Sequence, residues 1–446
     1  MLHKHIARHT KKYVSHITKY LYERDTLFAT IAVFVFLILL GMIPINFYVL
    51  NPMKIALKDF DFNDIAYAKL GKGDKEDTTI KYENRIAIIN IGHLDRGSLA
   101  ELITKVSSMK PKIMGLDVYF DGSREPEQDS LLGAVFRNTK NLVVVNREAY
   151  DIESHKIFIR PDNFDSVYHH RGFANLDADT IGTVRVYSPF DKVDDQIIPH
   201  FTTAVVREYD SNAYHKLEKR HKKQEIINYS RRIDKYRVLT SDQIMQDEVT
   251  NDWVEGKIVL FGYISEGPDD IEDKKFTPMN VEYVGKAKPD MNGVVVHANI
   301  ISMVLDANYI QKMPKWVAWV VAIIIGWIHM SLFIRYYLES HIWFHLVAKL
   351  AQVFSVLLFA YLGIFLYDQF RIKLDMKYTL YVIALAVDVI YFYEAFVGWL
   401  HRKYGYQTIF GHHHAAGHDT DHKPEHHNNE QHNEHHKHEH TTHEHH

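Results

Sequence analysis

The chain has 446 residues, a net charge of −4 with neutral histidines, and no cysteine. This charge gives no basic field of the kind that nucleic-acid-binding proteins carry. The lack of cysteine excludes disulfides, a catalytic thiol and cysteine-based zinc sites. The mean hydropathy of −0.24 would suit a soluble protein, but the apolar residues are concentrated in a few long runs that could cross a membrane.

Four apolar stretches reach the roughly 20 residues that a membrane-spanning helix needs. They cover residues 27–50, 316–334, 342–367 and 380–400. The first is too long for the apolar run of a signal peptide, and Asn46-Phe47-Tyr48 is a poor cleavage context, so we expect a retained anchor. The remaining segments are a basic N-terminus (1–26), a large polar segment (51–315) and a tail (401–446).

Lysines and arginines beside the spans predict the orientation, because they concentrate on the cytoplasmic side. Six of them precede the first span, and Arg402 and Lys403 follow the last one. Both termini are therefore predicted to be cytoplasmic, with residues 51–315 on the other side of the membrane. The loop between the third and fourth spans holds Arg371, Lys373 and Lys377, which favours the opposite orientation mildly.

The segment 51–315 alternates short apolar runs with helical patterns, which predicts an α/β domain with a mixed sheet and helices on both faces. Its first half is predicted to contain strands at 85–91, 113–120 and 141–146, a helix at 99–109 capped by Ser98, and a helix at 129–137 capped by Asp129. Its second half is predicted to contain a helix at 201–209, strands at 226–229, 257–262 and 294–296, and a helix at 298–305. Residues 51–82 and 216–237 have the composition of loops.

Six pieces of this segment carry a family resemblance. They are Ile86-Ala-Ile-Ile-Asn-Ile91, Gly115-Leu-Asp-Val-Tyr-Phe120, Gly172-Phe-Ala-Asn-Leu176 with Asp179-Thr-Ile-Gly-Thr-Val-Arg185, Lys257-Ile-Val-Leu-Phe-Gly262, Asp273-Lys-Lys-Phe-Thr-Pro278, and Gly293-Val-Val-Val-His-Ala-Asn299. In this order, and followed by three close spans, they resemble the CHASE2 domain, a sensory module of bacterial membrane receptors. The stretch 289–303 is most similar to the Bacteroidota versions.

The resemblance implies a protein of the bacterial inner membrane whose sensory domain is periplasmic. In that family a cytoplasmic output domain such as a kinase or cyclase follows the last span, and we expect none after Arg402. The opening strand of the family often ends in paired acidic residues, but here the place is taken by Asn90-Ile-Gly-His93. This departure weakens any ligand chemistry that would need those acids.

The polar residues of the matched pieces are the candidate ligand-binding residues. They are Asp117, Asp179, Arg185, Asp273 and His297. Ligands of open α/β sheets lie at the carboxyl ends of the strands, so a small anionic or polar ligand held by Arg185 and His297 is one hypothesis. A buried structural ion-pair network of Asp117, Arg185 and His297 is the alternative. The chain has no nucleophile elbow, phosphate loop or H-E-x-x-H motif, so we expect no enzymatic activity.

Ionisable and polar residues also lie inside the predicted spans. They are His329, Lys349, Gln352, Asp388 and Glu394. A charge facing lipid costs at least ~2.5 kcal/mol, so these groups should face one another inside a helix bundle. Lys349 and Glu394 fall at similar depths, which predicts a pair that fixes helix packing; a proton or ion path is the alternative.

The tail holds about half of the chain's 31 histidines. The candidate metal ligands are His412, His413, His414, His418, His422, His426, His427, His432, His435, His436, His438, His440, His443, His445 and His446. Such a tract cannot form a core, so it is predicted to be disordered. Its imidazoles could hold labile Zn, Ni or Cu, with incidental metal affinity as the alternative; no cofactor is required.

Three functions fit these features. The leading one is a membrane sensor that binds a small molecule or protein outside the cytoplasm and acts through a separate signalling or envelope partner, without catalytic output or nucleic-acid binding. The second is a metal-buffering or metal-handling membrane protein that uses its tail. The third is a structural docking subunit of an envelope complex.

Overall fold

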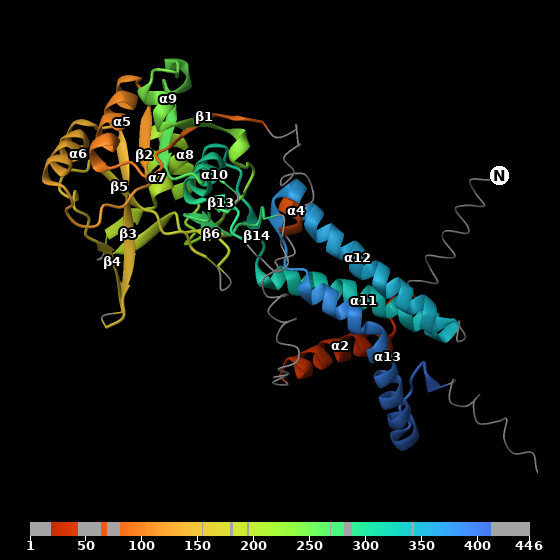
Figure 1. Ribbon diagram of the computed structural model, residues 1–446. Coiled ribbons are helices and arrows are strands. Elements are labelled where there is room, and N and C mark those ends of the chain that lie inside the picture. Colours follow the sequence, from red (N-terminus) through yellow and green to blue (C-terminus); the bar gives the residue numbers. More distant parts are fainter. Residues whose placement is uncertain are drawn as a thin grey trace, which may run out of the picture. The chain divides into compact units, whose positions relative to one another are not determined.

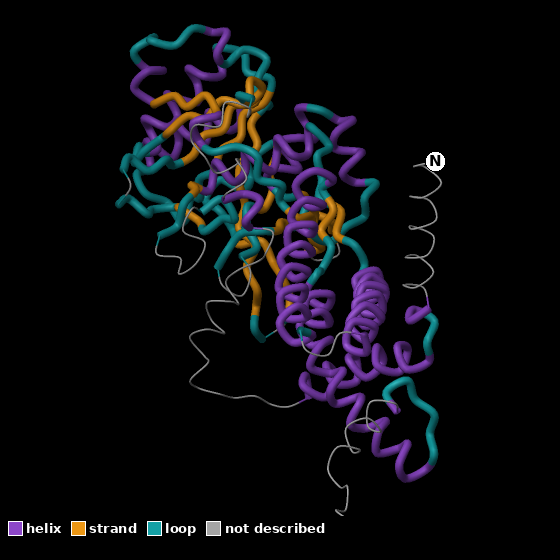
Figure 2. Tube along the Cα trace, turned by 90° about the vertical axis from the view of Figure 1, so that its right-hand side faces the viewer, coloured by secondary structure: helices purple, strands orange, loops and turns teal. Residues whose placement is uncertain are grey.

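The structure is a computed structural model that describes residues 19–42, 64–68, 81–153, 155–178, 182–193, 196–267, 269–280, 288–339 and 343–411. The chain forms two compact units. The larger comprises Leu37–Gly326 and Lys349–Ala384, and the smaller comprises Met1–Phe36, Trp327–Ala348 and Leu385–His446. The larger unit contains the α/β domain, whose strands are gathered together in Figure 2.

A seven-stranded sheet forms the centre of the α/β domain (Figure 1). Its strands are β1 (Glu83–Asn90), β2 (Ile113–Leu116), β3 (Leu142–Asp151), β4 (Lys156–Arg160), β5 (His170–Phe173), β10 (Tyr236–Thr240) and β11 (Ile258–Gly262). The order is β10-β1-β11-β2-β3-β4, and β5 also pairs with β3. Every pair is parallel except β3 with β4. The predicted mixed α/β fold is therefore confirmed.

Helices cover both faces of this sheet, because its inner strands are apolar on both sides. On β1, Ala87 and Ile89 belong to the core beneath α5 (Arg96–Ser108), α6 (Pro126–Asn138) and α9 (Ser241–Met245). Ile86 and Ile88 belong to the opposite core, beneath α7 (Phe201–Tyr209), α8 (Ser211–Glu218) and α10 (Gly293–Leu305). The near-continuous apolar runs seen in the sequence reflect this double burial.

Helix α10 contradicts the strand predicted at residues 294–296. Its three consecutive valines favour a strand by local preference, yet they form the first turns of a 13-residue helix. Twelve of those residues are buried, and a helix that is apolar all round is one that the fold encloses. Gly262 allows the close approach, because a Cβ there would come within 2.6 Å of Val294 Cβ. Tertiary packing has overridden propensity.

Other boundaries differ from the prediction for local reasons. Asp95, not Ser98, is the N-cap of α5, and its carboxylate accepts the Ser98 N–H. Helix α6 begins at Pro126, so Asp129 lies in its first turn, where it accepts a hydrogen bond from Arg96 at 2.5 Å. The strand predicted at 226–229 reduces to β9 (Glu225–Ile226). Strand β10 was missed because it follows a basic stretch with loop-like composition.

The remaining elements are short. Strand β6 (Val186–Tyr187) pairs with β9, β7 (Phe190–Val193) with β8 (Gln196–Pro199), and β12 (Lys274–Lys275) with β13 (Met291–Asn292). Two 3₁₀ turns cover Ile233–Lys235 and Asn251–Trp253. Helix α4 (Asp64–Ala68) lies within a stretch that was predicted to be a loop.

Within the described ranges, four helices are long and apolar enough to cross a membrane, as predicted. They are α2 (Arg24–Met42), α11 (Lys315–Glu339), α12 (Phe344–Phe370) and α13 (Lys377–Tyr404). In the larger unit, β14 (Gln311–Lys312) pairs with β15 (Ile372–Lys373). The chain that leaves the domain therefore lies beside the loop between α12 and α13.

The smaller unit holds the start of α2 against the segment that follows α13. The Asp25 carboxylate is buried and accepts hydrogen bonds from Tyr393 Oη (2.9 Å), Thr408 Oγ1 (2.9 Å) and the Ile409 N–H (2.8 Å). Arg24 lies over the Tyr406 ring at 4.5 Å. The N-terminal end of α2 and the C-terminal end of α13 are thus together.

Candidate functional site

A cavity of about 440 Å³ lies at the carboxyl edge of the parallel strands. Asp117 and Tyr119 reach it from the chain that follows β2, Arg147 from β3, Asn175 from the chain after β5, and Tyr263 from the chain after β11. Carboxyl ends of parallel strands form the usual ligand site of open α/β sheets. The cavity is therefore where the sequence predicted a ligand.

The first two turns of α10 form another wall of this cavity, with Gly293 and His297. Asp273 holds this end of the helix, because its Oδ2 accepts the Gly293 N–H at 3.2 Å. A Cβ on residue 293 would lie 2.9 Å from that oxygen, so the contact requires glycine. The sequence pieces around Asp273 and Gly293 thus meet at one point.

Asp273 lies close enough to Asp117 to affect the ionisation of Asp117. Burial, and then the negative charge of Asp273, raise the pKa of Asp117 to about 7, and Lys275 offsets part of that rise. The Asp117 side chain is 17% exposed. Lys275 Nζ lies 3.1 Å from Asp273 Oδ1. Asp273 therefore has a cationic partner close by, whereas Asp117 is a carboxyl group whose charge is poorly stabilised.

His297 is buried beside Asp117 as a neutral imidazole. Its side chain is 2% exposed, and burial, then the charge of Lys275, lower its pKa to about 3. Its Nε2 lies 3.7 Å from Asp117 Oδ2, but a neutral imidazole does not form an ion pair. Its buried Nδ1 has no hydrogen-bond partner in the described part of the chain. An unsatisfied buried polar atom at a cavity wall is where a ligand or water could bind.

Arg147 and Tyr119 bring a cation and a hydroxyl to the cavity, and the sequence did not single them out. The Arg147 guanidinium lies 4.9 Å from the Tyr119 ring centre. Among the residues that the structure describes, Arg147 has no carboxylate within 4 Å, and the buried Tyr119 Oη has no hydrogen-bond partner. The position of Arg147 could have indicated it as a site residue, because Arg147 directly follows the apolar run of β3, where ligands of such sheets bind.

Arg185 lies elsewhere, so neither hypothesis that joined it to His297 describes the geometry. Its guanidinium forms an ion pair with Asp64 of α4, with Nε 3.1 Å from Oδ1. In the same helix, Tyr67 Oη lies 2.7 Å from Tyr367 Oη of α12. Asp179, the remaining candidate, lies outside the described residues. The structure thus brings together Asp117, Asp273 and His297, and their role in ligand binding stays a prediction.

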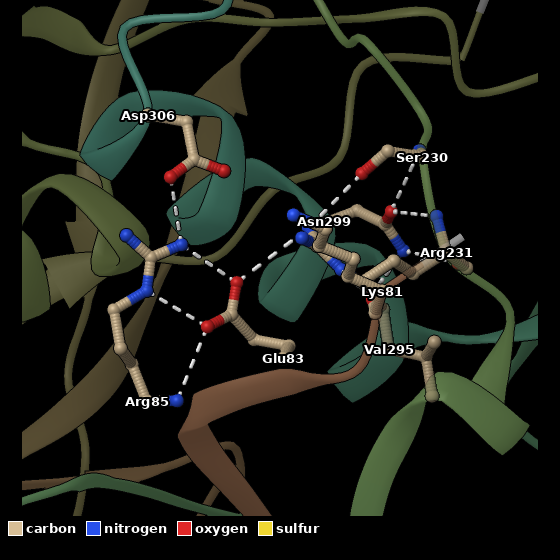
Figure 3. Close-up of polar contacts among 8 residues, drawn as sticks. All are labelled: Lys81, Glu83, Arg85, Ser230, Arg231, Val295, Asn299 and Asp306. Atoms are coloured by element: carbon tan, nitrogen blue, oxygen red, sulfur yellow. Dashed lines mark hydrogen bonds and ion pairs between the residues drawn. The ribbon is translucent and has the colours of Figure 1, made fainter. Parts of the chain in front are cut away.

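A second polar cluster surrounds Glu83 at the start of β1 (Figure 3). Arg85 donates to the Glu83 carboxylate at 2.8 and 2.7 Å and also contacts Asp306 at 2.8 Å. Arg231 Nη1 lies 3.5 Å from Glu83. Burial alone would raise the pKa of Glu83, but the hydrogen bonds and charge of Arg85, with the charge of Arg231, outweigh it and lower the pKa.

Asn299 of α10 completes this cluster. Its Oδ1 accepts the N–H groups of Ser230 and Arg231, both at 3.1 Å, and its Nδ2 donates to the carbonyls of Arg231 and Val295, both at 3.0 Å. The side chain is fully buried. The cluster therefore ties the strand that enters the domain to the helix that leaves it (Figure 3).

Asn90, at the end of β1, has a structural role. Its Oδ1 accepts the N–H groups of Gly92 and Ile264 at 3.0 Å, and its Nδ2 donates to the Ile264 carbonyl at 3.2 Å. The carboxyl ends of β1 and β11 are thereby joined. A carboxylate could not donate the last of these bonds, the one from Nδ2 to the Ile264 carbonyl.

Some of the polar residues inside the apolar helices are hydrogen-bonded within their own unit. Gln352 Nε2 donates to the carbonyls of Ile383 (2.8 Å) and Ala384 (2.6 Å). Glu394 accepts a hydrogen bond from Tyr337 Oη at 2.5 Å. The His329 ring lies 5.8 Å from the Phe333 ring. The predicted Lys349–Glu394 pair and the role of Asp388 stay predictions.

The tail histidines at positions 412–446 lie outside the described residues. Within the described residues, no group of three or more His, Cys, Asp or Glu side chains is arranged to hold a metal ion. The predicted labile metal binding of the tail therefore stays a prediction.

Comparison with known proteins gives one family. The family model described as the CHASE2 domain matches residues 74–333, more than half of the chain. The comparison with curated proteins returned no match. The comparison with solved structures returned none either.

Proposed function

Because this chain belongs to the CHASE2 family of sensor domains and carries four helices able to cross a membrane, we propose that it is an extracytoplasmic sensor. A small molecule binds in the cavity at the carboxyl edge of the sheet, and the change passes to the membrane helices. A CHASE2 domain is sensory rather than catalytic, so a separate partner protein carries the response. No described residue favours a metal-handling or a docking role over this one.

Helix α10 is the observation that carries this proposal. Its first two turns line the cavity through Gly293 and His297. Asn299, at the end of the second turn, holds the Glu83 cluster, and Asp306, immediately after the helix, contacts Arg85. Thirteen helical residues span about 20 Å, and α11 begins at Lys315, shortly afterwards. One buried helix thus runs from the cavity to the Glu83 cluster, and only a short segment separates its end from α11.

The α12–α13 loop offers a second route from the domain. The Gln311 N–H donates to the Arg371 carbonyl at 2.7 Å, and the Met313 N–H donates to the Lys373 carbonyl at 3.0 Å. Arg371 Nε also donates to Asn308 Oδ1 at 3.2 Å. A displacement of the chain after α10 would therefore be transmitted to α12 and α13 as well as to α11.

The same contacts support the orientation that we propose, with both termini cytoplasmic and the domain periplasmic in the inner membrane. The β14–β15 ladder supports it, because it joins the α12–α13 loop to the chain that leaves the domain. Within the smaller unit, the hydrogen bond between Asp25 and Thr408 joins the beginning of α2 to the segment after α13, which agrees with termini on one side. Arg371, Lys373 and Lys377 are then extracytoplasmic cations, held in part by Asp368 and Asp375.

Coupling between the cavity and the membrane end of the domain can be tested without knowing the ligand. Gly293→Ala places a Cβ 2.9 Å from Asp273 Oδ2 and must displace that carboxylate or the start of α10. Hydrogen exchange of the full-length protein in nanodiscs should then increase around residue 293 and also at residues 306–313 and 371–373. Gly133→Ala is the matched control, because its Cβ would meet the Phe164 ring at an ordinary 3.6 Å.

An increase confined to residues near 293 would contradict the proposal, because α10 would then not connect the two ends. Equal effects of G293A and G133A at residues 306–313 would contradict it too, since the response would not depend on the cavity.

A further inference from the structure

We propose that the cavity binds a small zwitterion, a free amino acid with an apolar side chain, whose ammonium group lies at Asp117 and whose carboxylate lies at Arg147. This inference rests on the proposed function, because it names the ligand class of the same cavity. A volume of about 440 Å³ lies within the ~300–1,000 Å³ typical of small-molecule sites.

The charges that line the cavity cancel. Asp117 and Asp273 are acidic, and Arg147 and Lys275 are basic. Asp273 and Lys275 pair with each other at 3.1 Å, which leaves the carboxylate of Asp117 and the guanidinium of Arg147. A ligand with separated charges and no net charge can complement both of these groups, because specificity depends on complementary potentials.

The acidic end lacks a cation at Asp117. Asp273 is already engaged by Lys275 at 3.1 Å and by the Gly293 N–H. In the described part of the chain, the Asp117 carboxylate accepts no hydrogen bond, and its closest basic group is the neutral His297 at 3.7 Å. An ammonium group there would supply charge and hydrogen bonds. The raised pKa of Asp117 agrees with a site that is incomplete without a cation.

The basic end lacks an anion at Arg147. A guanidinium group presents paired N–H donors that match a carboxylate, and those of Arg147 have no carboxylate partner among the described residues. The Tyr119 hydroxyl beside it is buried and has no hydrogen-bond partner there. A ligand carboxylate would satisfy both groups at once.

The rest of the lining fits an apolar side chain. Ala174, Leu176 and Val184 contribute to the wall.

The described residues offer no cluster of three or more His, Asp or Glu side chains with metal-binding geometry. The acidic end is therefore matched to an organic cation.

The test uses the full-length protein in nanodiscs and a panel of free L-amino acids as probes. Thermal stability is measured with each, because a ligand selective for the native state raises the melting temperature. For each amino acid that stabilises the protein, the amine without its carboxylate and the acid without its amino group are then titrated. We expect each half-ligand to bind at least about tenfold more weakly, since each lacks one charged hydrogen-bonding group.

Two variants separate binding from simple loss of structure. Arg147→Met should abolish the preference for the amino acid over its amine, and Asp117→Asn should abolish the preference for the amino acid over its acid. Unfolding would instead remove binding of every probe. Arg160→Met is the control, because Arg160 lies opposite Arg147 in the β3–β4 ladder, is exposed, and does not line the cavity. It should leave both preferences intact.

The inference is overturned if no amino acid stabilises the protein, if a half-ligand binds as tightly as the whole, or if R147M and D117N change neither preference. None of these results touches the coupling measured with G293A. The proposed function and the ligand class can therefore fail separately.

Discussion

Replacing Asp117 with asparagine should stabilise the ligand-free domain at neutral and alkaline pH. The native pKa of about 7 exceeds the ~3.9 of an unfolded aspartate by about 3 units. A carboxyl group whose pKa is raised on folding binds its proton more tightly in the native state, so stability falls as pH rises from ~4 to ~7. Asparagine keeps the shape of the side chain and does not ionise, so it escapes this penalty.

The magnitude follows from ~1.36 kcal/mol per pKa unit. At pH 8 the full difference applies, and D117N should gain up to about 4 kcal/mol in opening free energy. At pH 5 wild-type Asp117 is mostly protonated in the native state, and the gain should fall to about 1.5 kcal/mol. These are upper values, because the side chain is 17% exposed.

The assay is native-state hydrogen exchange at the amides of β2 and β11 in the full-length protein, which reports opening of the domain without assuming two-state unfolding. Asp121→Asn is the control: this acid is 60% exposed in the same segment and should change stability by under about 0.5 kcal/mol at both pH values. A gain for D117N that is equal at pH 5 and pH 8, or no gain at pH 8, would refute the reasoning.

Glu83→Gln should lower the unfolding free energy by roughly 2–4 kcal/mol, because Arg85 and Arg231 lose their buried carboxylate. The loss should appear as a lower melting temperature. An unchanged melting temperature would show that the cluster does not stabilise the domain. In wild-type protein this contribution should be complete above the unfolded glutamate pKa of ~4.3 and fade as pH falls through the lower native value. Gly262→Ala should lower the unfolding free energy by about 1–3 kcal/mol, because its Cβ would lie 2.6 Å from Val294 Cβ. Amide hydrogen exchange along α10 should become faster. Unchanged exchange would argue against tight packing of Gly262 on Val294. Tyr67→Phe and Tyr367→Phe should each cost about 1 kcal/mol. The double variant should cost less than the sum of the two losses, because one hydrogen bond joins the two hydroxyls; fully additive losses in a double-mutant cycle would contradict the pairing.

Patterns within a single element were readable from the sequence. The apolar runs of β1 and β11 predicted strands, and the four long apolar helices were recognisable by length. Helix α10 was misread because Val294–Val296 have strand propensity, while the packing that fixes them as helix involves Gly262, far away in the chain. Local preference could not show that contact.

The sequence predicted where the cavity lies, but it predicted only some of the residues that line it. Strand ends pointed to Asp117, and the family pieces pointed to Asp273 and His297, which the fold brings together. Arg147 was missed because only the parallel pairing of β2 with β3 sets it beside Tyr119. Arg185 was misassigned because its partner, Asp64, lies 121 positions away in a stretch with loop-like composition. Partners separated by this much chain are determined by topology rather than by local pattern.

A sensor of extracytoplasmic ligands must hold its α/β domain on the outer side of the membrane. The natural chain has no cysteine, so single cysteines report their own accessibility without background. Ile152→Cys in the domain and Tyr404→Cys at the end of α13 replace residues that are 78% and 65% exposed. In intact spheroplasts a membrane-impermeant maleimide should label I152C at once and Y404C only after lysis. Labelling of Y404C in intact spheroplasts, with I152C protected until lysis, would place the domain in the cytoplasm and contradict the account.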